Sequence, residues 1–138
     1  MAQIYEKQIE DMIPQLVSQT QASADSVWVA SRNVGVFGSV EALRKAVTDT
    51  RSRLGDDKPV VVALVGVSSD SGKPIICVAT NAPARKNGIK AGDLVRAASK
   101  ILGGGGGGKP DFAQGGGQDA SQAEAALDEI KRQVEVRD

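Results

Sequence analysis

The sequence predicts an α/β (α+β) domain in which helices cover a small mixed β-sheet. Two continuous apolar runs, Val60–Val67 and Pro74–Thr80, have the composition of strands buried on both faces. Apolar residues at helical spacing precede and follow these runs. The composition is 41% hydrophobic but only 3% aromatic, so the core must be built from aliphatic side chains. Helices and strands in this order indicate one layered domain.

The chain begins with a predicted helix over residues 1–21. Its apolar stripe requires a packing partner, which is the rest of this domain, a second copy, or a part of a longer protein. Pro14 interrupts the pattern and predicts a kink. We expect residues 1–24 to be a helical connection and residues 25–138 to be the globular domain. The stripe consists of Ile9, Met12, Ile13, Leu16 and Val17.

Two short strands, at residues 27–30 and 34–37, are expected next. Ser39 is then the predicted N-cap of a helix that ends at Gly55. The buried stripe of this helix comprises Val40, Leu43, Val47 and Leu54, and a basic, solvated side carries Arg44, Lys45, Arg51 and Arg53.

Residues 68–73 have turn chemistry, which predicts a hairpin between the two apolar runs. Residues 81–88 are rich in turn formers, and a helix is expected over residues 90–102. The last helix is predicted to start with a capping box, Ser121 to Glu124. Its apolar stripe is Ala123, Leu127, Ile130 and Val134.

Composition excludes several classes of protein. The 138 residues contain no histidine and a single cysteine, Cys77, in an apolar run, so a disulfide scaffold and a zinc site of Cys and His are ruled out. Neither a membrane span nor a signal peptide is visible, which predicts a soluble, cytoplasmic protein. We expect no cofactor in this chain.

Nine of the 16 glycines lie between Gly103 and Gly117, including six in succession from Gly103 to Gly108. Each ordered glycine costs about 0.5–1 kcal/mol relative to alanine, so the run needs a reason. Left-handed backbone angles and close approach of another surface are two such reasons, and a disordered linker is the alternative. The position between two helical patterns favours an ordered, functional loop.

Charge is unevenly distributed although the net charge is zero. Residues 85–118 hold six basic and two acidic residues, a net of +4, whereas residues 119–138 hold six acidic and three basic residues, a net of −3. Glycine N–H groups within a basic block favour phosphate binding. The candidate residues are Gly103, Gly104, Gly105, Gly106, Gly107, Gly108, Lys109, Arg85, Lys86, Lys90, Arg96, Lys100 and Gln114.

The glycine run gives no specific match to the known patterns of nucleotide-binding loops. The Walker pattern needs a Ser or Thr after its lysine and a preceding strand, but Pro110 follows Lys109 and a helix precedes the run. Any glycine run satisfies the dinucleotide pattern, so that match is uninformative. Phe112 is a candidate for stacking on a base, with core packing as the alternative.

The string from Gly103 to Gly117, which contains Lys109-Pro110-Asp111-Phe112-Ala113-Gln114, resembles a signature near the C-terminus of alanyl-tRNA synthetases. Leu43-Arg44, the Val60–Val67 run, Gly88-Ile89-Lys90-Ala91-Gly92 and the final helix extend the resemblance over about residues 27–136. Lys109 stands where the family often has Arg, and Phe112 where it often has Met.

This resemblance implies a part of an enzyme, namely the C-terminal domain related to the domain associated with DHH-type phosphodiesterases. It implies a non-catalytic domain that binds the outer corner of tRNA-Ala and helps couple aminoacylation with editing. ATP, magnesium and zinc would then belong to other domains of the parent ligase. A chain without histidine cannot contain the zinc-binding editing centre of that family.

Two alternatives remain open from the sequence. One is a dimerisation or structural module of the same synthetase, paired through the apolar stripes of the first and last helices. The other is a phosphate-binding accessory domain of a DHH-type phosphodiesterase, whose metal and catalysis would come from a separate domain. The expected partners are therefore tRNA, other domains of the parent, and a second copy of the chain.

Overall fold

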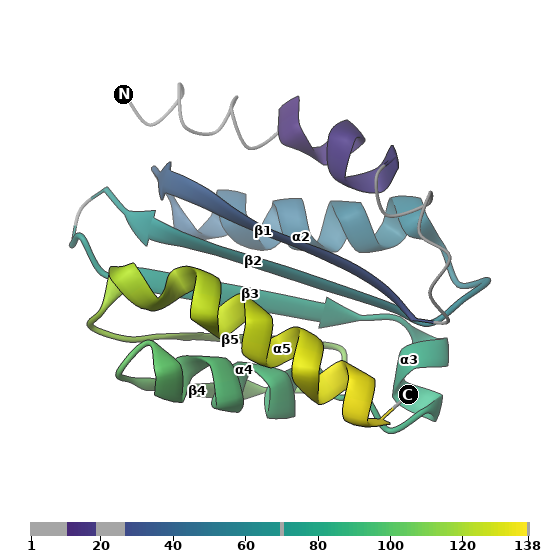
Figure 1. Ribbon diagram of the computed structural model, residues 1–138. Coiled ribbons are helices and arrows are strands. Elements are labelled where there is room, and N and C mark those ends of the chain that lie inside the picture. Colours follow the sequence, from purple (N-terminus) through teal and green to yellow (C-terminus); the bar gives the residue numbers. More distant parts are fainter. Residues whose placement is uncertain (1–10, 19–26, 70, 138) are drawn as a thin grey trace.

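The computed structural model describes residues 11–18, 27–69 and 71–137. Five strands form one mixed sheet in the order β1-β2-β3-β5-β4 (Figure 1). The strands are β1 (Trp28–Phe37), β2 (Val60–Ser68), β3 (Pro74–Thr80), β4 (Gly105–Gly108) and β5 (Phe112–Gly116). The helices are α2 (Val40–Leu54), α3 (Ala82–Lys86), α4 (Ala91–Ile101) and α5 (Ala123–Arg137), with a 3₁₀ turn at Ala120–Gln122.

The sheet joins two kinds of pairing, which confirms the expected mixed sheet. Strand β1 runs parallel to β2, and α2 makes the crossover between them. The pairs β2–β3, β3–β5 and β5–β4 are antiparallel. The two apolar runs therefore form the predicted hairpin.

Helices cover both faces of the central strands, so the molecule has three layers. Figure 1 shows α4 and α5 on one side of the sheet and α2 on the other. Alternate residues of β2 point to opposite layers: Val61 and Val65 join the cluster with α4 and α5, whereas Val62 and Leu64 join the cluster with α2. All four are fully buried, which explains why β2 is apolar from Val60 to Val67.

The described part of the first apolar stripe and the last apolar stripe both pack within this one chain. Residues 11–18 are helical through Pro14, and Met12, Ile13 and Leu16 pack in the cluster on the α2 side. Ile130 and Val134 of α5 pack in the opposite cluster. The remaining parts of the predicted connection, residues 1–10 and 19–24, lie outside the described residues, and so does Ile9.

Two helix-end predictions are confirmed, and one is wrong. The Ser39 hydroxyl accepts from the Ala42 N–H at 3.2 Å, and Gly55 follows α2 with a φ of 77°. The capping box expected from Ser121 to Glu124 does not start the last helix. Asp119 caps a 3₁₀ turn there instead, its carboxylate accepting from the Ser121 N–H at 3.1 Å, and α5 follows directly.

Three further expectations need correction. The two short strands expected in residues 27–37 are one strand, β1, whose register shifts between Asn33 and Gly35. Residues 81–88 contain the helix α3, because the Asn81 side chain caps it and Pro83 fits its first turn. The glycine run is not a loop, since Gly105–Gly108 forms the edge strand β4.

Candidate nucleic-acid interface

The glycine run pairs with the glycine-rich end of its own motif. Gly105, Gly106, Gly107 and Gly108 stand opposite Gly116, Gly115, Gln114 and Ala113. The Lys109 N–H donates to the Phe112 carbonyl at 3.0 Å and closes the turn between the two strands. Because hydrogen-bonded pairs alternate in an antiparallel ladder, the backbone polar groups of Gly106 point away from β5, toward the open edge of the sheet.

One face of β4 is closed by α4. A Cβ on Gly106 would lie 3.0 Å from Val95 Cγ1 and would collide with the backbone of Gly115. A Cβ on Gly115 would lie 2.7 Å from the same Val95 methyl and would collide with the buried Ser99 hydroxyl. These glycines are required because α4 packs directly on the backbone of the two strands, and no side chain fits between them.

The opposite face of β4 is open. A Cβ on Gly105 would meet no atom within 4 Å, and one on Gly107 would approach only Arg96 Nε, at 3.7 Å. Gln114 lies opposite Gly107 and is partly exposed. We call Gly105, Gly107 and Gln114 the open glycine face. On this side of the sheet α2 packs mainly on β2 and β3, and Figure 1 shows it away from β4.

Basic residues from α4 and from the β4–β5 turn border this face. Lys109 is exposed in the β4–β5 turn. Lys90 lies at the N-cap of α4, and the Ala91 N–H donates to the Pro110 carbonyl at 2.9 Å, so the start of α4 is held against this turn. Arg96 and Lys100 follow at four-residue spacing on the exposed side of α4. The structure thus brings Lys90, Arg96 and Lys109 to the glycine strand.

Arg85 and Lys86 lie on α3, at the end of the sheet where the β4–β5 turn also lies. Arg85 donates to the Thr80 carbonyl at 2.6 Å, and the Thr80 hydroxyl donates to the Pro110 carbonyl, also at 2.6 Å. Lys86 is exposed. These two residues are therefore neighbours of the turn and not of the open glycine face itself.

Sequence reasoning assigned the basic side of α2 to solvent, but part of it reaches the motif. The Arg44 guanidinium lies 5.3 Å from the centroid of the Phe112 ring, within range of a cation–π contact. Arg51 donates to the Asp111 carbonyl at 3.3 Å. Phe112 packs at the margin of the α2-side cluster. No local pattern could indicate these contacts, because about 60 residues separate the partners.

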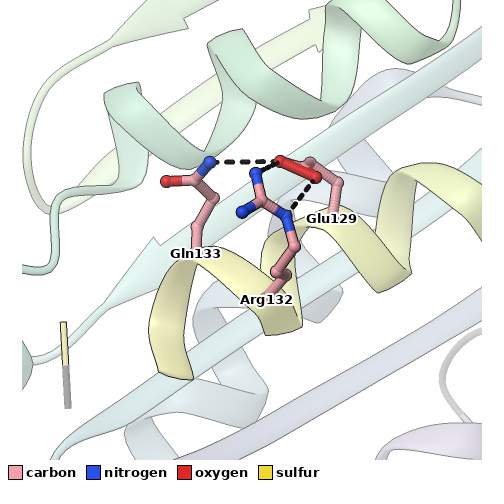
Figure 2. Close-up of polar contacts among 3 residues, drawn as sticks. All are labelled: Glu129, Arg132 and Gln133. Carbon is pink, nitrogen blue, oxygen red and sulfur yellow. Dashed lines mark hydrogen bonds and ion pairs between the residues drawn. The ribbon is translucent and has the colours of Figure 1, made fainter. Parts of the chain in front are cut away.

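The titratable groups with shifted pKa values, which are Cys77, Glu129 and Arg132, do not belong to the open glycine face. Burial raises the pKa of the Cys77 thiol to about 12, so it stays neutral, and Cys77 is a buried core residue. Hydrogen bonds from Arg132, and then from Gln133, lower the pKa of Glu129 to about 2 (Figure 2). The Arg132 Nε–H donates to Glu129 at 2.9 Å, and the Gln133 amide donates at 3.1 Å.

Within residues 11–18, 27–69 and 71–137, no three His, Cys, Asp or Glu side chains gather as a metal site would require. In the same residues, no helix combines the length and the apolar character of a membrane span. Arg96 forms an exposed ion pair with Asp93 at 3.3 Å. Such exposed pairs contribute little to stability, so the Asp93 pair leaves Arg96 able to move to another anion.

Comparison with known proteins identifies relatives of this chain. The family model described as the DHHA1 domain matches residues 29–136. An alanine–tRNA ligase of Bifidobacterium longum is 59% identical over 135 residues, covering 98% of this chain and 15% of the ligase. One of Kocuria rhizophila is 42% identical over the same shares. The chain thus spans about one seventh of these relatives, and it matches their C-terminal, non-catalytic region.

Solved structures share the fold. The C-Ala domain of Aquifex aeolicus alanyl-tRNA synthetase superposes with a TM-score of 0.61 at 24% identity, covering 80% of this chain and 88% of that one. RecJ of Thermus thermophilus superposes with a TM-score of 0.55 at 15% identity, covering 96% of this chain and 18% of that one. At these identities the likeness concerns the fold alone. The family match spans most of the sequence, and the chain therefore belongs to the DHHA1 domain family.

Proposed function

We propose that this chain is a non-catalytic RNA-binding domain of a longer alanine–tRNA ligase. It holds the outer corner of tRNA-Ala and so helps to present one tRNA to both the aminoacylation and the editing centres. The observation that carries the proposal is the open glycine face, bordered by the exposed cations Arg96 and Lys109. The names of the similar ligases supply the tRNA partner, and the proposed role implies a cytoplasmic location.

The geometry of β4 suits a phosphate backbone. Without side chains at Gly105 and Gly107, RNA can approach the strand closely, and the Gly106 N–H points toward the open edge. Lys109, Arg96 and Lys90 add attraction that does not depend on base sequence. Folded RNA is recognised largely by shape and phosphate, which a smooth surface with a basic border provides. Lys100 and Lys86 would contribute at longer range.

Binding of a tRNA-Ala transcript to the 138-residue chain tests the proposal. With about four phosphate contacts, affinity should fall about 50- to 150-fold between about 50 mM and about 200 mM salt. Lys109→Ala should weaken binding at low salt and lower the salt slope by about 1. Lys131→Ala is the matched control, because Lys131 is exposed on α5, outside the basic block. Affinity that does not change with salt would contradict the proposal.

In the alternative of a dimerisation module, the first and last apolar stripes would pair between two copies. The described portion of the first stripe and the α5 stripe are both buried within one chain. A homodimer stays a prediction, and sedimentation of the chain tests it. The alternative of a phosphodiesterase accessory domain likewise stays a prediction. Because catalysis would then come from a separate domain, turnover of a small phosphodiester by this chain alone would contradict the non-catalytic role itself.

A further inference from the structure

A polar pocket of about 290 Å³ lies beside the β4–β5 turn. The last turn of α2, the first turn of α3 and Asp111 of the turn form its walls. We call it the Arg51–Arg85 pocket. Its lining includes Arg51, Asp56, Thr80, Asn81, Arg85 and Asp111. Asp111 belongs to the glycine-rich motif but is not part of the open glycine face.

The floor of the pocket is fixed by Asn81, which is 3% exposed. Its carbonyl oxygen accepts from the N–H groups of Val60, at 2.8 Å, and Ala84, at 3.1 Å. Its amide nitrogen donates to the carbonyls of Gly55, at 2.9 Å, and Lys58, at 2.7 Å. One side chain thus joins the end of α2, the start of β2 and the cap of α3. Asn81 is fully occupied and is a structural residue of the pocket.

The two arginines are held in place by neutral groups. Arg51 donates to the Asp111 carbonyl and Arg85 to the Thr80 carbonyl. Among the described residues, neither guanidinium has a carboxylate oxygen within 4.0 Å. A guanidinium carries five N–H donors, so each retains donors beyond its one carbonyl contact. Both side chains are partly buried, which preorganises them for an anion.

The pocket also carries acceptors. The exposed carboxylates of Asp56 and Asp111 lie in its lining, so cationic donors and anionic acceptors are both present. A bare anion would use only the arginines. A sugar–phosphate unit uses both, since its phosphate accepts from guanidinium groups and its ribose hydroxyl donates to a carboxylate. The volume is at the lower end of small-molecule sites, about 300–1,000 Å³, which suits one such unit.

We propose that the Arg51–Arg85 pocket binds one ribose–phosphate unit of the RNA backbone that also crosses the open glycine face. This inference rests on the proposed function. Arg51 and Arg85 hold the phosphate, and Asp111 or Asp56 accepts from the 2′-hydroxyl. The pocket therefore extends the RNA site from Lys109 toward α2, and its carboxylates let the domain distinguish RNA from DNA.

Arginine variants test the phosphate contact. Arg51→Gln and Arg85→Gln should each bind the tRNA-Ala transcript about tenfold more weakly at low salt, with a salt slope reduced by about 1. Arg53→Gln is the matched control, because Arg53 is exposed two residues further along the same helix. Thermal unfolding of each variant checks that it is folded.

A second arm tests the ribose contact. A transcript with 2′-deoxy nucleotides at its outer corner should bind the unaltered chain about tenfold more weakly. The double variant Asp56→Asn, Asp111→Asn should bind the two transcripts with nearly equal affinity. Inorganic phosphate, added at constant ionic strength, should not displace the transcript. Displacement by millimolar phosphate would overturn the assignment to RNA and indicate a free-anion site.

The outcomes separate this inference from the function on which it rests. If Lys109→Ala weakens binding but folded Arg51→Gln and Arg85→Gln bind like the unaltered chain, the pocket is not part of the RNA site, and the RNA-binding role stands. If the unaltered chain fails to bind the transcript at low salt, both proposals are overturned.

Discussion

The central hairpin and the glycine ribbon are built on the same hydrogen-bonded ladder, yet they differ in almost every other respect. The hairpin of β2 and β3 has aliphatic side chains on both faces and is covered by two helical layers. The ribbon of β4 and β5 is covered by α4 on one face, and on the other face its β4 strand is open. Removing side chains from a sheet edge gives up hydrophobic burial and yields a smooth surface that another molecule can approach. The centre of the sheet thus supplies the stability, and its β4 edge is the proposed binding surface.

Truncation of a core side chain should destabilise the β2–β3 hairpin without changing RNA binding at the β4–β5 ribbon. Leu64 of β2 is fully buried in the α2-side cluster. Leu64→Ala should lower the free energy of unfolding by about 2–5 kcal/mol, from lost transfer energy and an unfilled cavity. Urea unfolding measures this change. At a temperature where the variant is folded, the salt slope of tRNA binding should match that of the unaltered chain, and a changed slope would contradict this separation.

Neighbouring glycines of β4 allow a matched comparison within the ribbon. Gly106→Ala should cost about 1–3 kcal/mol, because its Cβ would press on Val95 and on the backbone of β5. Gly105→Ala should change stability little, or raise it by up to about 1 kcal/mol, since its Cβ would meet open space. Urea unfolding of the two variants checks the difference.

The same pair separates folding from function. Gly105→Ala should weaken tRNA binding although the protein is as stable as before, because its methyl group would stand on the open glycine face. Equal destabilisation by the two substitutions would show that β4 has no closed and open faces, and the comparison would fail.

The smallest expected effect concerns the pH dependence of stability at α5. The pKa of Glu129 is lowered from 4.5 to about 2, so its contribution to folding is present above pH 4.5 and is lost as the pH falls toward 2. The stability difference between the unaltered chain and Glu129→Gln should therefore shrink over this range. Chemical unfolding at several pH values measures it, and a constant difference would exclude the ionised carboxylate as its source.

Local chemistry was sufficient to predict much of the hairpin side of the molecule. Aliphatic runs, the cap at Ser39 and the terminating Gly55 are signals carried by neighbouring residues, and the structure confirms them. The helix α3 was overlooked although Asn81 and Pro83 provide an N-cap and a first-turn proline. The glycine strand could not be recognised, because residues without side chains show no alternation of polar and apolar positions.

The candidate site was predictable only where its residues are close in sequence. Lys109 and the glycines were identified together because they share one motif. Arg44 and Arg51 were missed, because their contacts with Phe112 and Asp111 arise only when α2 packs on the sheet. The same holds for Asn81, whose four hydrogen bonds join segments that are separate in the sequence.

The edge position of β4 has a consequence for local unfolding. Among the described residues, the strand pairs with β5 at the edge of the sheet and packs mainly against α4, so separating it exposes little apolar surface. Its amide protons should therefore exchange with solvent through openings that need less free energy than global unfolding, whereas those of β2 should exchange only when the whole domain unfolds. Bound RNA should slow amide hydrogen exchange most at Gly105 to Gly108. Exchange at these residues would therefore report whether the RNA site is occupied.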